Sequence, residues 1–336
     1  MTISLLLIPW LALLPEDRPD PVRVERHLTL MGTTLVISVE AGDRRAAMAA
    51  SEKALEALHR AERRLSTWTN DSELARLNEA EVGRTVSLSP ELAADLTVAR
   101  GWWIATGGAF DPGIGTLTEI WGLRSGGKMP TRALLDRVGD LPGLEALDMD
   151  GPTAARRHPD LRIDEGGFGK GAGLDDAVRK LTETDATSAM INLGGQVALY
   201  GSGRSVRFEV ADPSDRQQVA LTLTIDRGAL ATSGNSERGL VIGDRTYSHI
   251  LDPKSGMPVP DFGSLTVWAD DALAADCLST GLYVLGPEKA LDWAAERDGI
   301  EVLVLESSDD GMYARATTGF RGRIDSGGPD VVLSFR

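Results

Sequence analysis

The sequence predicts an α+β fold in which helices flank largely antiparallel sheets. Segments with the alternation and β-branched residues typical of strands follow one another in runs, and they do not alternate strictly with helical segments. The 336-residue chain shows no internal repeat, and its 42% hydrophobic and 25% charged residues are ordinary for a globular protein. This length allows one large domain or two, with ample residues for a buried core.

The first 24 residues differ in composition from the rest of the chain. Residues 3 to 14 are apolar, which is the length of a secretory signal's hydrophobic region and too short to span a bilayer. No basic residue precedes them, no lipobox cysteine follows, and "PEDRPDP" is a proline-rich charged linker. We expect a signal-like or anchoring segment with its linker over residues 1–24 and the folded domain over residues 25–336. Such a segment predicts an exported, periplasmic or cell-surface protein with a possible membrane association; an interfacial or packed N-terminal segment is the alternative.

Strands and helices alternate irregularly through the first half of the domain. Residues 27–42 alternate and are rich in β-branched side chains, so they predict a strand pair or one bent strand. Residues 44–65 repeat alanine and leucine at helical spacing. The next helix has Ser89 as its cap and Pro90 as its first residue, and Gly107-Gly108 should end it. Residues 164–183 predict a glycine-rich turn that runs into a helix.

The second half of the domain is richer in strands. Strand patterns occupy residues 188–201, 207–213, 221–234 and 263–269, and two helices should follow over 271–285 and 287–297. The last segment, 300–336, is again rich in strands.

Charge and cysteine content exclude several kinds of site. Fifty acidic against thirty-five basic residues give a net charge of −15, which argues against binding nucleic acid through a diffuse basic surface. Any bound phosphate must therefore be held by local devices such as backbone amides, a lysine or a metal ion. The single cysteine, Cys277, allows no internal disulfide and no Cys-rich zinc site, and its neighbours indicate a small apolar helix residue.

The segment "DEGGFGKGAGLDDA", residues 164–177, has the composition of an anion-binding loop. Its glycines could turn backbone N–H groups toward an anion at a helix N-terminus, and Lys170 could add a point charge. No Ser or Thr follows the lysine, so it is not a Walker A loop. The alternative is a tight turn that merely requires glycine.

A second segment, "ADDALAADCLSTGL", places Asp276 and Thr280 four residues apart and hence on one face of a helix. A carboxylate and a hydroxyl so placed suit a hard divalent cation. The alternative is an exposed polar pair, although the apolar neighbours imply that Asp276 is buried and needs a partner. Asp270 and Asp271 are expected to cap this helix.

One of the four histidines, His249, lies in "TYSHILDPKSG" at residues 246–256. A lone histidine is more often structural than catalytic. Here small polar residues and a glycine turn surround it, so a role as a general base stays open beside the structural one.

Taken together and in order, eight segments resemble the motifs of the ApbE-like family, the FAD:protein FMN transferases. They are "MGTTLVISV", "LSTWTNDSELARLN", "GGAFDPGIGTLTEIWG", "DEGGFGKGAGLD", "INLGGQVALYG", "ATSGNSERG", "YSHILDPKSGMPV" and "ADCLSTGLYVLG". The resemblance covers roughly residues 27 to 306. It implies an ApbE-like, T-fold-like arrangement of mixed, largely antiparallel sheets with flanking helices.

The resemblance also implies a reaction: FAD is the substrate, Mg²⁺ sits at its diphosphate, FMN moves to a threonine hydroxyl of an acceptor protein, and AMP leaves. Metal ligands would be the Gly167 carbonyl, Asp276 and Thr280, and His249 would act as the base. Residues matched to the FAD site are Met31, Ser66, Trp68, Asp111, Lys170, Asp175, Ser233 and His249, with Trp68 beside the isoalloxazine ring. The chain departs from the family pattern at Glu165, Gly169, Ala172 and Asn235.

The expected partners are FAD and an acceptor protein of the membrane redox subunit type, and no nucleic acid. Two alternatives remain open. The protein could hydrolyse FAD to FMN and AMP as a pyrophosphatase, or it could bind and deliver FAD without catalysis.

Overall fold

The computed structural model describes residues 20–201, 205–235, 239–308, 311–326 and 331–336. The apolar segment at residues 3–14 lies outside the described residues, so its signal-like role stays a prediction. The first strand, β1 (Val22–Leu30), begins within the range expected for the linker. Among the helices of the described residues, none is long and apolar enough to cross a membrane.

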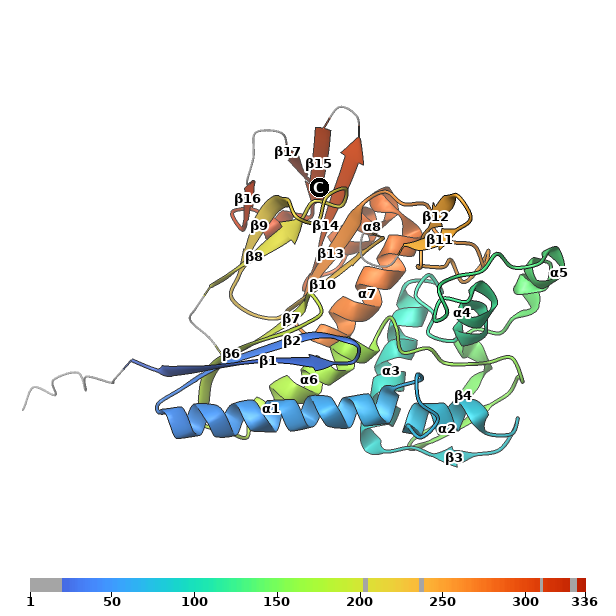
Figure 1. The fold of residues 1–336 in the computed structure, drawn as a ribbon, viewed down its shortest axis with the longest axis horizontal. Helices are drawn as coiled ribbons and strands as arrows, with labels where there is room; N and C mark the ends of the chain where they lie inside the picture. The colour runs from blue at the N-terminus through green and yellow to red at the C-terminus, as the bar shows by residue number, and fades with distance from the viewer. Residues whose placement is uncertain (1–19, 202–204, 236–238, 309–310, 327–330) are drawn as a thin grey trace, which may run out of the picture.

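A mixed sheet forms the centre of the molecule (Figure 1). Within the described residues its nine strands lie in the order β1-β2-β6-β7-β10-β13-β14-β15-β17. Neighbours are antiparallel except for β15 and β17, which are parallel. After β1 the strands are β2 (Thr33–Ala41), β6 (Ala186–Leu193), β7 (Gln196–Gly201), β10 (Ala229–Gly234), β13 (Ser264–Ala269), β14 (Ile300–Ser308), β15 (Gly311–Ala316) and β17 (Val331–Phe335). The expected α+β class with largely antiparallel sheets is confirmed.

Both faces of this sheet are covered. Helices α1 (Arg44–Leu65), α6 (Gly169–Leu181), α7 (Ala272–Leu285) and α8 (Pro287–Ala295) pack on one face. A small sheet of β16 (Ile324–Ser326), β9 (Val219–Ile225) and β8 (Val206–Ala211) covers the other. In β13, Leu265 and Val267 face the helices and Trp268 faces the small sheet, because side chains alternate along a strand.

Local sequence signals account for the helix ends. The Ser89 hydroxyl accepts a hydrogen bond from the Leu92 amide at 3.2 Å, which caps α3 (Pro90–Ala105) as predicted. Gly107 and Gly108 follow its end with φ values of +61° and +81°, a region that favours glycine. At α7, the Asp271 carboxylate caps the helix by accepting from the Ala274 amide at 2.7 Å.

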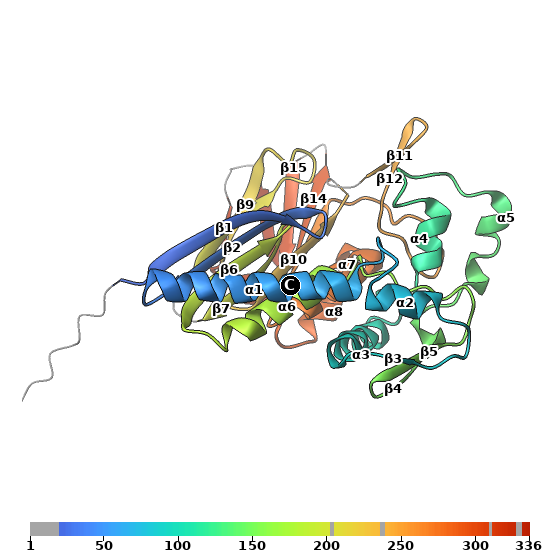
Figure 2. The ribbon, with the colours of Figure 1, turned by 60° about the horizontal axis from the view of Figure 1, so that its bottom comes forward.

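A second core lies beyond the C-terminal end of α1 (Figure 2). It contains α2 (Glu73–Glu79), α3 and a small sheet, and it buries Cys277 completely. Its place in this apolar core agrees with the small apolar helix residue expected from the sequence, and burial raises the pKa of the Cys277 thiol. The small sheet comprises β3 (Val86–Ser87), β5 (Thr153–Arg156) and β4 (Leu147–Asp150).

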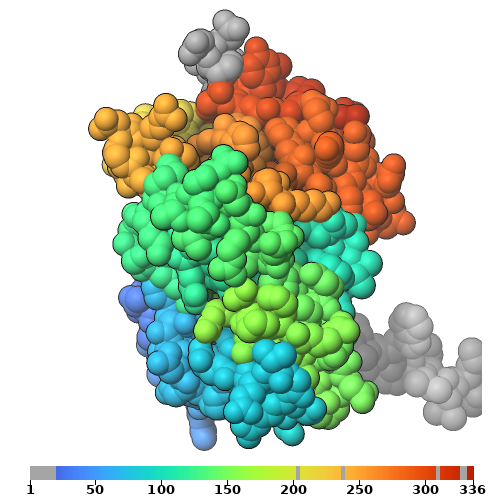
Figure 3. Space-filling model, turned by 90° about the vertical axis from the view of Figure 1, so that its right-hand side faces the viewer, coloured from blue at the N-terminus to red at the C-terminus, as the bar shows by residue number. Residues whose placement is uncertain are grey.

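The remaining elements are short, and all of them except the Thr318–Phe320 turn, which packs against β14 and the sheet of β8, β9 and β16, lie around α4 (Gly115–Trp121). In Figure 3 the green segments that include α4 form the middle of one face, between orange segments above and blue ones below. The other short elements are α5 (Arg132–Leu135), the hairpin β11 (Leu240–Ile242) and β12 (Arg245–Tyr247), and the 3-10 turns at Val138–Asp140, Leu144–Ala146 and Thr318–Phe320.

Candidate active site

Helices α6 and α7 each hold a carboxylate of the other at their N-terminus. The Asp175 oxygens of α6 accept from the Ala272 and Leu273 amides at 2.8 and 2.9 Å. In return, Asp276 Oδ2 of α7 accepts from the Gly171 amide at 2.9 Å. Each negative charge therefore meets the positive end of a helix dipole. A Cβ at Gly171 would lie 2.7 Å from Leu273 Cα, so this exchange requires glycine there.

The loop that precedes α6 approaches α7 at Thr280. A Cβ at Gly167 would lie 3.2 Å from Thr280 Oγ1 and 3.3 Å from Phe110 Cε2. Thr280 lies one helical turn beyond Asp276. The three residues matched to the metal site, Gly167, Asp276 and Thr280, therefore lie on two adjoining segments. Gly167 and Gly171 do not have left-handed φ values, so backbone conformation does not require glycine at these positions. Glycine instead allows the loop to pack closely against α7.

The backbone amides at the start of α6 are used inside the protein. Those of Phe168 and Gly169 donate to the Glu165 carbonyl at 3.0 and 2.7 Å, and that of Gly171 donates to Asp276. The anion at this helix N-terminus is thus the Asp276 carboxylate. The amide cradle expected from the glycine spacing is filled at these positions by the protein's own groups.

Asp276 is only 4% exposed, and its environment suits a cation. Burial raises the pKa of its carboxyl group, while the positive charge of Lys170 and the Gly171 amide act against the rise. Among the described residues, Asp276 has no ion-pair partner within 4.0 Å. The Asp276 carboxylate, the Thr280 hydroxyl and the Gly167 carbonyl are all hard oxygens, the donor type that fits Mg²⁺.

This set contains only one carboxylate. In the part of the chain that the structure describes, no group of three or more His, Cys, Asp or Glu side chains could hold a metal. A divalent cation held by one carboxylate, one hydroxyl and one carbonyl would have further coordination positions for water and phosphate oxygens.

His249 is half-buried in a bend that follows β12. The Ser248 hydroxyl donates to Asn235 Oδ1 at 2.6 Å, and the Asn235 amide donates to the Tyr283 hydroxyl at 3.2 Å. Tyr283 belongs to α7, the helix that carries Asp276. These bonds fix the backbone beside the imidazole relative to α7.

Three further residues matched to the FAD site lie at element ends. The Met31 amide, in the turn between β1 and β2, donates to Glu62 Oε1 at 2.9 Å. Ser233 of β10 donates to the Ser279 hydroxyl of α7 at 3.1 Å. Ser66 is the C-terminal cap of α1.

Asp111 lines a cleft of about 350 Å³. Its carboxylate accepts from the Gly113 and Leu144 amides at 2.7 and 3.1 Å and from Trp103 Nε1 at 3.1 Å. Burial nevertheless raises the pKa of Asp111 to about 6, with the two backbone amides acting against the rise. Lys254, five residues beyond His249, lines the same cleft.

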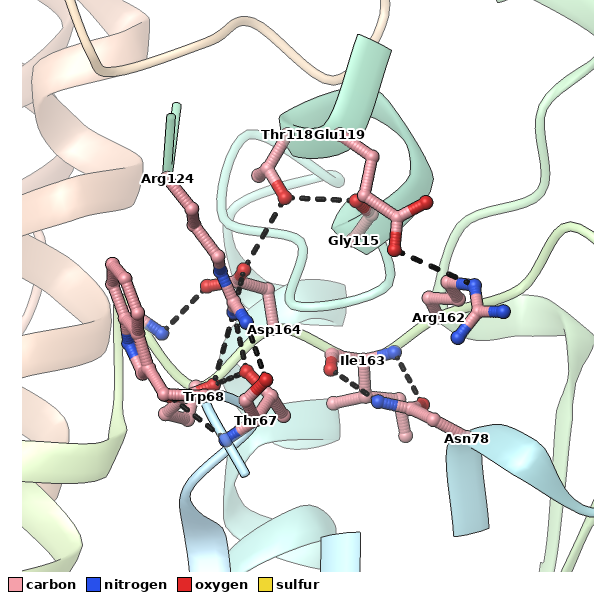
Figure 4. A network of polar contacts seen from close by, with 12 residues as sticks. Thr67, Trp68, Asn78, Gly115, Thr118, Glu119, Arg124, Arg162, Ile163 and Asp164 are labelled. Carbon is pink, nitrogen blue, oxygen red and sulfur yellow. Dashed lines mark hydrogen bonds and ion pairs between the residues drawn. The ribbon is translucent and has the colours of Figure 1, made fainter. Parts of the chain in front are cut away.

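Trp68 is 67% exposed on the loop that follows α1, and Arg124 lies over its ring at 5.0 Å from the centroid (Figure 4). The Arg124 guanidinium also donates to the Thr67 carbonyl at 2.6 Å and to Asp164 Oδ2 at 2.7 Å. Glu165 accepts from the Thr67 amide at 3.1 Å. An indole face and the start of the glycine-rich loop are thus joined by one arginine.

Comparison with known proteins decides the family. The model of the ApbE family matches residues 31–304. The chain belongs to the ApbE family.

The relatives of this ApbE-family chain cover most of its length. The FAD:protein FMN transferase of Vibrio cholerae serotype O1 is 30% identical over 76% of this chain and 79% of that protein. The protein of the same name from Escherichia coli strain K12 is 27% identical over 93% of both. The solved flavin transferase ApbE from Vibrio cholerae superposes with a TM-score of 0.76 at 27% identity, covering 90% of this chain and 99% of that one.

Sequence reasoning did not find Arg124 in this ApbE-family chain. Its partners Thr67 and Asp164 are 57 and 40 positions away, and no local pattern marks them. The one available signal was Glu165, an acid at an unusual position for the ApbE family, because a buried acid needs a polar partner. The roles of the residues matched to the FAD and metal sites stay predictions.

Proposed function

We propose that this chain is an FAD:protein FMN transferase that moves FMN from FAD to a threonine hydroxyl of an acceptor protein and releases AMP. The observation that carries the proposal is the approach of Gly167 to Thr280, one turn from the buried Asp276, in a chain of the ApbE family. Relatives that span most of the chain bear the name of this activity. Mg²⁺, when bound, would offset the negative charge of the diphosphate.

In the proposed reaction the threonine oxygen attacks the phosphorus on the FMN side of the diphosphate. The bond from that phosphorus to the bridging oxygen breaks, and AMP leaves with the bridging oxygen. His249 takes the threonine proton, and the Ser248, Asn235 and Tyr283 hydrogen bonds hold its backbone in place. Trp68 offers its exposed face to the isoalloxazine ring.

The proposal includes the cellular setting. The apolar residues 3–14 support an exported protein, periplasmic or at the cell surface, with a membrane association. A threonine-bearing acceptor of the membrane redox subunit type would meet the enzyme there. The net charge of −15 supports the exclusion of nucleic acid as a partner.

The experiment incubates the protein with FAD, Mg²⁺ and a threonine-containing acceptor peptide, and follows AMP by chromatography and the peptide by mass spectrometry. We expect the peptide to gain one FMN residue for each AMP released. AMP with an unmodified peptide would instead show a pyrophosphatase. Bound but intact FAD would show a non-catalytic binding protein.

Asp276→Asn tests the metal ligand within the same assay. The amide keeps an oxygen that can accept from Gly171 but removes the charge, so we expect metal-dependent transfer to fall at least a hundredfold. Asp270→Ala, which removes an exposed carboxylate beside the same helix, is the matched control and should transfer normally. Near-normal transfer by Asp276→Asn would contradict the metal assignment.

A further inference from the structure

Arg124 lies between two segments that are far apart in the sequence. It follows α4, and its side chain is 31% exposed. On one side its guanidinium donates to the Thr67 carbonyl at 2.6 Å and lies over the Trp68 ring. On the other it pairs with Asp164 at 2.7 Å (Figure 4). The Trp68 loop, residues 66–72, is thereby attached to the residues that begin the glycine-rich loop.

A second set of hydrogen bonds joins the same two segments without Arg124. The Thr67 amide and hydroxyl both donate to the Glu165 carboxylate. Asp164 and Glu165 are adjacent carboxylates, and Arg124 lies within 2.7 and 3.5 Å of their oxygens. The guanidinium therefore offsets the repulsion between two acids that precede Gly166 and Gly167.

We propose that Arg124 is a positioning residue that fixes the Trp68 indole relative to the loop carrying Gly167. The inference rests on the proposed function, in which the indole receives the flavin ring. The Trp68 indole and the loop that carries Gly167 would contact the two ends of the FMN half of FAD, the ring and the phosphate. Arg124 would keep these two parts of the protein at a fixed separation. We assign Arg124 an action through Trp68, because its Nη1 and Nη2 groups already donate to Thr67, Asp164 and Glu165.

A double-mutant cycle on FAD affinity tests this coupling. We expect Arg124→Ala to weaken FAD binding about tenfold, since charge-assisted hydrogen bonds of this kind support effects of that size. In a Trp68→Ala background the same substitution should change binding less than about twofold. Arg124→Lys keeps the charge without the planar fork, so it should restore only part of the affinity.

Hydrogen exchange without FAD gives a second readout. Arg124→Ala should raise the exchange of amides in residues 66–72, including the Thr67 amide that donates to Glu165. Arg132→Ala is the matched control: this arginine is 89% exposed and pairs with Asp136 on the surface, so its loss should leave the loop unchanged.

The outcomes separate the inference from the function. Equal losses of affinity from Arg124→Ala with and without Trp68, or unchanged exchange in residues 66–72, would overturn the positioning role while wild-type transfer remained intact. Failure of the wild-type protein to bind FAD would overturn the proposed function, and the flavin part of this inference with it.

Discussion

His249 can be tested separately from the fold that surrounds it. The hydrogen bonds that join Ser248, Asn235 and Tyr283 do not use its imidazole. We therefore expect His249→Ala to bind FAD normally while transfer falls by roughly 10²–10⁴-fold, the usual contribution of a general base. FAD titration and single-turnover peptide flavinylation measure the two quantities.

The matched control is His27→Ala. The side chain of His27 is 65% exposed on β1, so its loss should leave both FAD binding and transfer unchanged. Transfer by His249→Ala at the wild-type rate would remove the histidine from the chemistry.

Asp111 predicts a pH dependence of stability. Its pKa is about 6 in the fold against about 3.9 in an unfolded chain, so the folded state holds its proton more tightly between these values. Its contribution to the free energy of unfolding therefore falls as pH rises from about 4 to 6, by at most about 3 kcal/mol. The amide of Asp111→Asn cannot titrate, so this variant lacks that contribution to the pH dependence of stability.

Urea unfolding of both proteins at several pH values tests the sign. The stability advantage of the wild type over Asp111→Asn should narrow as pH rises from 4.5 to 7. A difference that stays constant or widens with pH would show that burial does not favour the protonated Asp111 carboxyl.

At the scale of residues, the sequence predicted what local spacing encodes. Asp276 and Thr280 share a helix face because they are four positions apart, and that spacing is visible without a structure. The approach of Gly167 to Thr280 and the pairing of Arg124 with Asp164 are not visible, because each depends on how separate elements pack. The resemblance to the family motifs predicted that Gly167 and Thr280 lie close together. No sequence feature predicted the pairing of Arg124 with Asp164.

Among the helices, one buried arginine joins three elements. Arg64 of α1 pairs with Asp95 of α3 at 2.7 Å and with Asp176 of α6 at 2.9 Å, and its side chain is 8% exposed. Burial raises the pKa of Asp95 to about 6, and the Arg64 charge acts against that rise. The ion pairs therefore fix α6, which carries the glycine-rich loop at its start, against α1 and α3.

Among the described residues, Arg64→Ala should leave the buried Asp95 without an ion-pair partner and Asp176 with Arg179 alone. We expect it to lower the free energy of unfolding by about 3–5 kcal/mol in urea melts at pH 7. Arg60→Ala, which breaks an exposed pair with Glu56 on the same helix, should lower it by less than about 1 kcal/mol. Equal effects of the two substitutions would argue against the buried triad.

Most elements followed from periodicity, and the differences have physical causes. The pattern of residues 27–42 predicted a strand pair or one bent strand; the structure has a pair, and β1 begins earlier, at Val22. Its residues alternate between intermediate and exposed positions on an edge strand, so charged side chains conceal the strand pattern. The parallel pairing of β15 and β17 and the carboxylate exchange between α6 and α7 are tertiary features that local patterns do not encode.

In the molecule as a whole, α6 and α7 lie between two hydrophobic cores. Leu174 and Leu278 belong to the core beneath the central sheet, whereas Phe168 and Leu273 belong to the core around α2 and α3. The Asp276 region therefore sits where both cores hold the backbone from opposite sides. This placement would keep the proposed metal site rigid, and it leaves the exposed Trp68 loop as the part whose position needs an added restraint.

The net charge of −15 predicts how salt affects substrate binding. FAD carries negative phosphates, so the field of the whole molecule should slow its approach at low ionic strength. The Debye length falls from about 30 Å at 0.01 M salt to about 8 Å at 0.15 M, which screens that repulsion. At fixed Mg²⁺ the association rate of FAD, followed by stopped-flow flavin fluorescence, should therefore rise severalfold over this range.

Uncharged riboflavin is the control and should bind at a rate independent of salt. An FAD rate that falls with added salt would mean that positive groups near the site, such as Lys170 and Lys254, outweigh the charge of the rest of the protein.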